Sequence, residues 1–309
     1  MESVFGYEYE PTAHLLVTDE DAADFLQSQF TNDLRPFEEG RSTYGLWLDV
    51  KGKVVADSFV LCEGEERFRI LSEASAATAL VEKLERHIIA DDVEIEVLPA
   101  GRAIALVGVS AEAVLQALGF AVPREGAFVQ TEGVSIFRGR RSLVANFELW
   151  AESEAVASRL KARLLEQSVE FVTQDRVHAV RIAAGIPSVP VEIGPADLPG
   201  EGALVGDAVS LQKGCYLGQE VVSRMYNVGS PQRALYRMAG SGVVPVCPVV
   251  LYMGAKKVGE LRSAFSVGDG WQGVAILKTR FAVVGEVLAY DAGSAEVECL
   301  FSAVQEGSK

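Results

Sequence analysis

The stretch LQKGCYLGQEVVSRM, residues 211–225, holds the residue types in this sequence that are best suited to chemistry. Cys215 comes two residues after Lys213 and just ahead of a segment whose pattern predicts a helix that starts at Gly218 and ends at Gly229. The partial positive charge of a helix N-terminus and a nearby ammonium both favour thiolate over thiol. The stretch therefore predicts a nucleophilic or redox-capable Cys215 that Lys213 activates. The alternative is a small buried apolar residue, which is the usual role of a lone cysteine.

The glycines of this stretch allow a second kind of chemistry. Gly214 and Gly218 let the backbone approach a ligand closely, and the N–H groups at a helix start can hold a carboxylate or phosphate. Lys213 or Arg224 would add positive charge. Because the sequence has neither a Walker motif nor a G-x-G-x-x-G motif, it does not indicate a nucleotide-binding fold.

The composition limits the class of protein. A chain of 309 residues predicts two or three packed units. The net charge of -15, from 28 Lys+Arg and 43 Asp+Glu, repels phosphates, so we expect no direct nucleic-acid partner. We also expect a cytoplasmic protein with no membrane partner, because no long apolar run or signal peptide is visible. The four scattered cysteines and three separated histidines predict neither a metal site nor a disulfide framework.

The order of the patterns predicts three segments. Residues 1–100 contain a strand, a helix with a capping box at Thr18 and Asp21, a three-stranded meander and a second helix. Residues 101–232 repeat this order, which predicts two related α+β units that face each other across a channel. Chance similarity of amphipathic segments is the alternative. Residues 233–309 consist of short β-type runs between glycine turns, which predicts a small β-barrel or sandwich.

The segment KGCYLGQEVVSRM closely resembles the K-G-C-Y-x-G-Q-E signature of the YgfZ folate-binding proteins. This group includes mitochondrial iron–sulfur assembly factors and is related to the aminomethyltransferases of glycine cleavage. FLQSQFTNDL, LDVKGKVVADSFVL, RIAAGIP and KVGELRSA look like further blocks of the family, so the likeness covers nearly the whole chain. It implies an α+β fold in which two related mixed α/β units enclose a tetrahydrofolate channel beside a C-terminal β-barrel.

The resemblance also implies a function and a site. It implies a tetrahydrofolate-binding accessory protein, with tetrahydrofolate or a one-carbon form as cofactor. This protein would support the assembly or repair of iron–sulfur clusters in client enzymes, and through them tRNA modification. Its partners would be folate and iron–sulfur client enzymes or assembly factors, and Cys215 would face the folate channel. The residues expected to bind folate are Asn32, Asp33, Asp57, Arg181, Gly214, Tyr216, Gly218, Gln219, Glu220 and Arg224.

Several of these residues also have plainer interpretations. Asn32 and Asp33 are typical of a simple helix end, and Asp57 of a solvated strand residue. Arg181 is suited either to a folate carboxylate or to an acid within the protein. Tyr44, Trp47 and Phe59 are candidates for stacking on a pterin, although aromatic residues on strands are more often part of the core.

Two other functions remain open from the sequence. Aminomethyltransferases resemble one another in an acidic pair and in a glutamate that reads the folate ring. Here Asp57 keeps one position of the pair, Ala56 takes the other, and Ala183 or Ala184 stands where the glutamate is expected. Alanine cannot bond pterin N–H groups, so aminomethyl transfer is the alternative rather than the first hypothesis. The third hypothesis is a cluster carrier, which would need a dimer or a partner because clusters usually take four thiolates.

Overall fold

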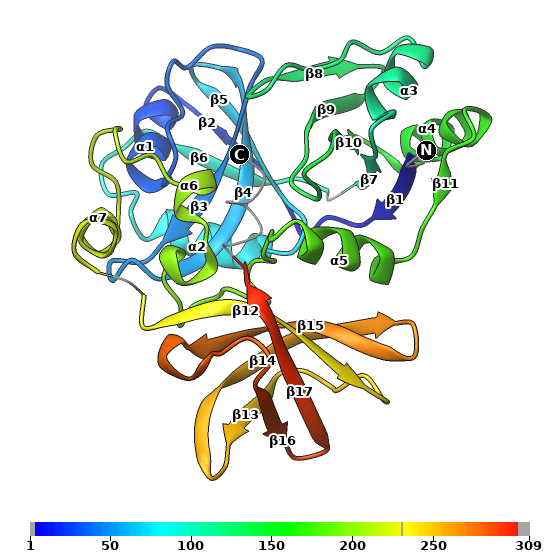
Figure 1. Ribbon diagram of the computed structural model, residues 1–309. Helices are drawn as coiled ribbons and strands as arrows, with labels where there is room; N and C mark the ends of the chain where they lie inside the picture. Colours follow the sequence, from blue (N-terminus) through cyan, green and yellow to red (C-terminus); the bar gives the residue numbers. More distant parts are fainter. Residues whose placement is uncertain (1–3, 100, 230, 302–309) are drawn as a thin grey trace.

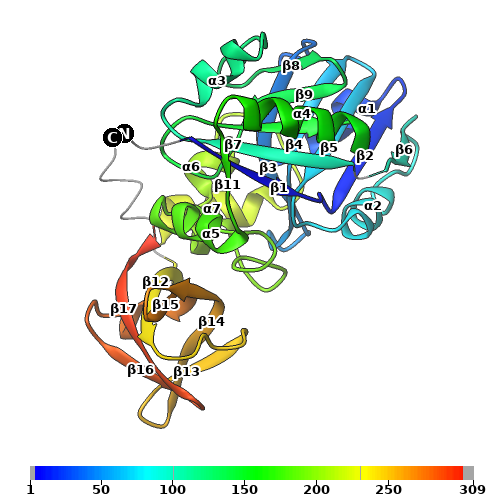
Figure 2. The same cartoon turned by 90° about the vertical axis from the view of Figure 1, so that its right-hand side faces the viewer.

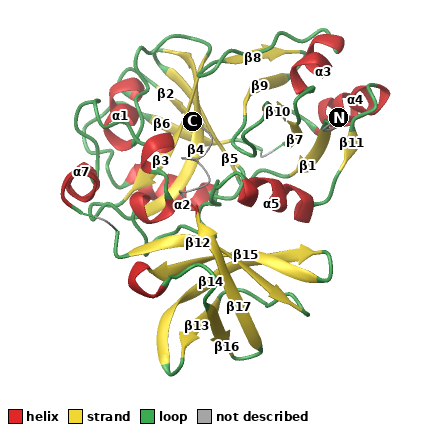
Figure 3. Ribbon diagram, viewed as in Figure 1, coloured by secondary structure: helices red, strands yellow, loops and turns green. Residues whose placement is uncertain are grey.

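The computed structural model describes residues 4–99, 101–229 and 231–301. Two β-sheets face each other, helices cover their outer faces, and a β-barrel lies below them (Figure 1; Figure 3 colours the same view by secondary structure). The view in Figure 2, turned by 90°, also separates the barrel from the two-sheet unit. The expected fold class, two related mixed units followed by a barrel, is thus confirmed.

The first sheet has five strands in the order β3-β4-β5-β2-β6. Its strands and covering helices are β2 (Ala13–Thr18), α1 (Ala22–Gln29), β3 (Arg41–Leu48), β4 (Val54–Gly64), β5 (Arg67–Ser72), α2 (Ala77–Glu85) and β6 (Glu94–Val97). The predicted capping box at Thr18 is wrong. Thr18 is the last residue of β2, where it pairs with Arg67 and Glu94, and α1 begins after Asp21 without a side-chain cap.

The second sheet has six strands in the order β11-β1-β7-β10-β9-β8. Its elements are β1 (Phe5–Tyr9), β7 (Arg102–Val107), α3 (Ala111–Ala117), β8 (Phe128–Thr131), β9 (Val134–Arg138), β10 (Asn146–Ala151), α4 (Glu154–Glu166) and β11 (Glu170–Phe171). Both units run strand, helix, three-stranded meander, helix, strand, so the predicted repeat of the element order is confirmed.

The strand β1 breaks this symmetry. The predicted boundaries place it in the first unit, residues 1–100, but the structure inserts it into the second sheet. There it pairs antiparallel with β7 along its whole length and parallel with β11. The two units are therefore tied together by the start of the chain as well as by packing.

Each sheet buries both faces, because successive side chains of a strand point to opposite sides. On β4, Ala56, Val60 and Cys62 pack under α1 and α2. Leu61 and the half-buried Phe59 instead contact the core shared with the second sheet. From Ala56 to Cys62 this alternation turns Asp57, Phe59 and Leu61 toward the space between the sheets and Ala56, Val60 and Cys62 toward the helices.

The chain after the second sheet leads to the barrel. It forms α5 (Gln174–Ala183), the 3-10 turn η1 (Pro199–Gly202), α6 (Val205–Ala208) and α7 (Gln219–Val228). As predicted, α7 lies between Gly218, whose φ is 83°, and Gly229. Among all helices of the described ranges, none has the length and apolar character needed to cross a membrane.

The six barrel strands close in the order β12-β15-β14-β13-β16-β17. They are β12 (Arg233–Ser241), β13 (Val249–Met253), β14 (Lys256–Val267), β15 (Gly270–Lys278), β16 (Val287–Tyr290) and β17 (Gly293–Leu300), with the 3-10 turn η2 (Thr279–Phe281) after β15. The fully buried Asp197 accepts hydrogen bonds from Arg233 of β12 and Arg262 of β14. These ion pairs fix the barrel against the segment between α5 and η1.

Candidate functional site

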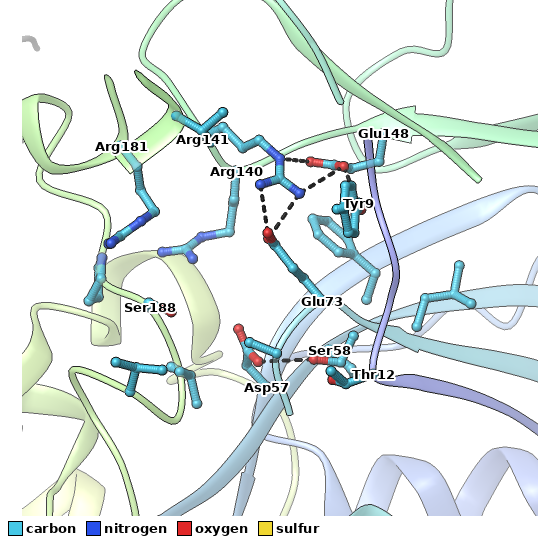
Figure 4. A pocket seen from close by; sticks show the side chains of 18 of the residues that line it. Tyr9, Thr12, Asp57, Ser58, Glu73, Arg140, Arg141, Glu148, Arg181 and Ser188 are labelled. Atoms are coloured by element: carbon cyan, nitrogen blue, oxygen red, sulfur yellow. Dashed lines mark hydrogen bonds and ion pairs between the residues drawn. The ribbon is translucent and has the colours of Figure 1, made fainter. Parts of the chain in front are cut away.

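A cavity of about 540 Å³ lies between the two sheets, which is within the size range of small-molecule sites (Figure 4). Its walls come from strands of both sheets, from α5 and the segment after it, and from the barrel. The polar and aromatic residues that line it include Tyr7, Tyr9, Glu10, Thr12, Tyr44, Asp57, Ser58, Phe59, Ser72, Glu73, Phe137, Arg140, Arg141, Glu148, Trp150, Gln174, His178, Arg181, Ser188, Glu192 and Ser263.

Asp57 belongs to the face of β4 that looks into the cavity. Its carboxylate accepts hydrogen bonds from Tyr44 Oη at 2.8 Å, Ser75 Oγ at 2.7 Å and Ser72 Oγ at 3.3 Å. Burial raises the pKa of Asp57, and the bonds from Ser75 and Tyr44 oppose that rise. No guanidinium or ammonium group of the described residues forms an ion pair with it. Asp57 is therefore a buried carboxyl group held in place by hydroxyl groups.

Arg141 forms the centre of a buried charge network on the second sheet. It donates from Nε to Glu148 Oε1 at 2.7 Å and from Nη1 to Glu73 Oε1 at 3.0 Å. Tyr9 Oη donates to Glu148 Oε2 at 2.7 Å, and the Arg141 guanidinium lies 4.6 Å from the centre of the Tyr9 ring. Two carboxylates thus share one guanidinium, so this group carries a net negative charge that faces the cavity through the half-exposed Glu73.

Arg181 projects from α5 and pairs with an acid of the chain. Its Nη1 and Nη2 atoms each donate to one oxygen of Glu192 at 2.8 Å. Glu192 is fully buried and also accepts a hydrogen bond from the backbone N–H of Ser188 at 2.8 Å. Burial alone would raise the pKa of Glu192, but Arg181 and the other donors outweigh it and lower the pKa. Of the two partners predicted for Arg181, the structure shows the internal acid.

Arg140 is the third arginine of the cavity. Its Nε donates to the carboxylate of Asp207 in α6, and its guanidinium carbon lies 4.1 Å from the centre of the Tyr44 ring. Its Nη2 atom is buried and has no hydrogen-bond partner among the residues that the structure describes. In Figure 4 the guanidinium of Arg140 extends toward Arg181, whereas Arg141 turns toward Glu73 and Glu148. Arg140 therefore differs from Arg141 and Arg181 in having an N–H donor group, at Nη2, that no described residue accepts.

The signature loop, residues 211–218, lies outside the cavity. Lys213 Nζ donates to the carbonyl oxygens of Gln27, Phe30 and Asn32 at 2.7, 2.8 and 2.8 Å, around the end of α1. Burial lowers the pKa of Lys213 to about 8, although only the ammonium form satisfies all three carbonyls. Because α1 covers the outer face of the first sheet, this bonding holds the loop on the side away from the second sheet.

Cys215 is exposed, but it does not line the cavity that the resemblance led us to expect it to face. That part of the prediction is wrong because Lys213 binds the end of α1 instead of approaching a ligand. The other three cysteines are buried or half-buried. Cys215 thus exposes its thiol to solvent from a loop that Lys213 anchors to the end of α1.

The other predicted folate-binding residues on this side also serve the fold. Asn32 Nδ2 donates to the carbonyl of Tyr44, and Asp33 Oδ1 accepts from Gln27 Nε2, both at 2.8 Å. Tyr216 is buried in an apolar cluster. Gly218 packs tightly on the turn between β3 and β4, where an added Cβ would lie 2.8 Å from Asp49 O. The predicted residues that do not line the cavity are Asn32, Asp33, Lys213, Gly214, Cys215, Tyr216, Gly218, Gln219, Glu220 and Arg224.

The structure adds residues that the sequence did not single out. Of the predicted set only Asp57 and Arg181 line the cavity, whereas Glu73, Arg140, Arg141 and Glu148 do so without having been predicted. One signal was available, because the acid of NFELWA interrupts an otherwise apolar strand and the arginines of RGRR follow another. Among the aromatic candidates, Tyr44 and Phe59 line the cavity, while Trp47 is fully buried under α1.

Comparisons with known proteins place the chain in a family. Residues 1–204 match the family model of the GCVT N-terminal domain. The tRNA-modifying protein YgfZ of Vibrio vulnificus (strain YJ016) is 27% identical over 260 residues, 84% of this chain and 74% of that protein. YgfZ of Yersinia enterocolitica is 26% identical over 230 residues, 74% of this chain and 69% of its own.

Aminomethyltransferases are similar as well. That of Bacillus cytotoxicus is 26% identical over 260 residues, 80% of this chain and 70% of the relative. The crystal structure of the glycine cleavage system aminomethyltransferase T from Bartonella henselae superposes with a TM-score of 0.81 at 19% identity, covering 98% of this chain and 88% of that one. The fold is therefore shared, and the resemblance inferred from the sequence is confirmed. The protein belongs to the GCVT N-terminal domain family, as a member that resembles YgfZ.

Proposed function

We propose that the protein binds tetrahydrofolate, or a one-carbon form of it, in the cavity between the two sheets. The proposal depends on one observation: a cavity of about 540 Å³ that combines aromatic walls, carboxylates and an arginine with unused donors. A reduced folate has a bicyclic pterin with a planar pyrimidine ring and N–H donors at one end, and carboxylates at the other. Tyr44 and Phe59 supply aromatic faces, and Asp57 and Glu73 supply acceptors for N–H groups. The residues present therefore fit this cofactor.

We further propose that the protein serves as an accessory factor for the assembly or repair of iron–sulfur clusters in client enzymes. Relatives in this family carry the name tRNA-modifying protein, and we assign that role here to client enzymes instead of to direct RNA binding. A net charge of -15 opposes contact with an RNA backbone. This role places the protein in the cytoplasm with its clients.

Cys215 is the residue that we assign to the clients. Its thiol is exposed, and the loop is anchored through Lys213 and through the hydrogen bond from the Leu217 N–H to Ser28 O at 3.0 Å. An anchored loop holds a thiol in one place at little entropic cost when a partner approaches. Folate in the cavity and a client at Cys215 would thus occupy different surfaces of the molecule.

Aminomethyl transfer is the second candidate, and Asp57 is the observation that favours it. A buried carboxylate in a folate-sized cavity suits the stabilisation of positive charge on a transferred carbon. Against it, Ala56 packs among the residues under α1 and α2, so the second acid of the pair is absent from the cavity side. Release of ammonia from an aminomethylated lipoyl carrier protein in the presence of tetrahydrofolate would favour the transferase.

The test of the main proposal combines binding with genetics. Anaerobic calorimetric titration with tetrahydrofolate and its 5-formyl form is expected to show one site per chain. Expression of the protein in a strain that lacks its own homologue is expected to restore the activity of iron–sulfur enzymes. Absence of any folate binding would refute the cofactor assignment, and binding without restored enzyme activity would refute the accessory role.

A further inference from the structure

Three arginines line the cavity, and the chain provides acceptors for two of them. Arg141 directs Nε, Nη1 and Nη2 at Glu148 and Glu73. Arg181 directs Nη1 and Nη2 at Glu192. Both guanidinium groups are thus paired with carboxylates before any ligand arrives. In such pairs the fork of N–H donors matches the two oxygens of the acid.

Arg140 differs because the chain satisfies only one of its nitrogen atoms. Its Nε donates to Asp207, while Nη2 is buried without a partner among the described residues, and none of them accepts a hydrogen bond from Nη1. The side chain is 15% exposed, and its guanidinium carbon lies 4.1 Å from the centre of the Tyr44 ring, so packing restricts its orientation. A buried donor left unpaired costs about 1–3 kcal/mol, which a ligand with a matching acceptor removes.

The acidic groups nearby do not supply that acceptor. Asp57 accepts hydrogen bonds from Ser75 and Ser72 at Oδ1 and from Tyr44 at Oδ2, but from no nitrogen atom of Arg140. The oxygens of Glu73 point to Arg141 (Figure 4). Because Arg140 lines the cavity and its side chain is 15% exposed, its guanidinium can meet an anion that comes from outside the chain.

The arrangement of the N–H donors of Arg140 indicates which kind of anionic group it can bind. The terminal N–H groups of a guanidinium form paired hydrogen bonds with the oxygens of a carboxylate or a phosphate. In a folate, the anionic groups are the carboxylates of its glutamate. We propose that Arg140 binds a glutamate carboxylate of the folate and thereby makes the cavity prefer folates over pteroates, which have the same ring and benzoyl group but no glutamate. This inference depends on the folate binding proposed above.

The experiment compares two ligands on the unaltered protein and on variants. The ligands are 5-formyltetrahydrofolate and 5-formyltetrahydropteroate, measured by calorimetry without oxygen. The unaltered protein is expected to bind the folate at least tenfold more tightly, because hydrogen bonds to charged groups contribute about 1.5–3 kcal/mol. Arg140→Met is expected to lose that preference by weakening folate binding at least tenfold while changing pteroate binding less than about twofold. Arg140→Lys is expected to keep part of the preference, because a point charge remains.

The control is Arg138→Met. Arg138 lies close by on β9 and pairs with Glu112 outside the cavity, so its loss is expected to change neither affinity. Equal affinity of the unaltered protein for both ligands overturns the role of Arg140 while leaving folate binding intact, and this comparison needs no variant. Binding of neither ligand refutes the proposed function itself. If Arg140→Met weakens both ligands equally, or neither, the contact with the glutamate is refuted.

Discussion

The cavity and the signature loop are the two polar regions of this molecule that invite a function, and they are built in opposite ways. The cavity collects charged side chains from residues 10 to 192 and from both sheets. The signature loop is a run of eight consecutive residues, 211–218, whose lysine and glycines hold it against α1 and the turn between β3 and β4. In the cavity the charged side chains come from distant parts of the chain, whereas in the loop Lys213 and Tyr216 are buried against the protein and Cys215 is exposed.

This difference shows that residues of a contiguous sequence motif can be needed for the local structure rather than for ligand contact. Lys213, Tyr216 and Gly218 maintain the shape of the loop, and Cys215 alone among these four is exposed for contact with a partner. A conspicuous local pattern can therefore consist mostly of residues that fix a conformation. The cavity in which we propose that folate binds is lined instead by side chains that have no common sequence pattern.

The largest effect on stability is expected at Arg141, whose buried charge lies in the wall of the cavity. Arg141→Met leaves Glu148, whose side chain is 5% exposed, without its cation. We expect the free energy of unfolding to fall by about 3–5 kcal/mol, measured by urea denaturation. The double variant Arg141→Met with Glu148→Gln is expected to recover part of this loss. A single variant within about 1 kcal/mol of the original protein would show that the network does not stabilise the fold.

The signature loop is tested next, at Lys213. Lys213→Met leaves three carbonyl oxygens at the end of α1 without their donor, and we expect a loss of about 2 kcal/mol in unfolding free energy. Lys51→Met, which alters an exposed lysine in the turn after β3, is the matched control with an expected change under about 0.5 kcal/mol. Equal effects of the two substitutions would argue against an anchoring role.

The burial of Asp57 in the cavity wall predicts a pH dependence of the protein's stability. Burial raises the pKa of Asp57 in the folded chain above the usual 3.8. At a pH between the unfolded and the folded pKa, Asp57 therefore keeps a proton in the folded chain that it has lost in the unfolded chain. The stability due to this group is therefore lost as the pH rises through the folded pKa. We expect Asp57→Asn to gain stability relative to the original protein between pH 4 and pH 7, measured by thermal unfolding. A difference that stays constant over this range would contradict the buried charge. The same variant is expected to bind folate more weakly.

The smallest effect on stability is expected at Cys215. Because the thiol is exposed, Cys215→Ala is expected to change the unfolding free energy by less than about 0.5 kcal/mol and to leave folate affinity unchanged. It is nevertheless expected to abolish the support of iron–sulfur enzymes in a strain that lacks the homologue. Full rescue of that strain by the alanine variant would remove Cys215 from the mechanism.

Much of the architecture could be predicted because it is encoded locally. The glycines at 218 and 229 bound α7 as expected, and the repeated order of strands and helices predicted two related units. The insertion of β1 between β11 and β7 of the second sheet could not be predicted in this way, because a strand with apolar residues is compatible with a place in either sheet. The site was harder still, since Arg140 and Tyr44 meet only when two sheets face each other.

The sequence by itself determined the elements, the duplication, the barrel and the exposed cysteine ahead of a helix, because turn residues and hydrophobic periodicity act over a few neighbouring positions. Only the tertiary structure decided which charged groups are already paired. Lys213 is taken up by the end of α1 and Arg181 by Glu192, whereas Arg140 keeps unused donors in the cavity. The physical reason is that a charge buried in a protein takes whichever partner the packing brings within hydrogen-bond distance, and that distance is set by the whole fold.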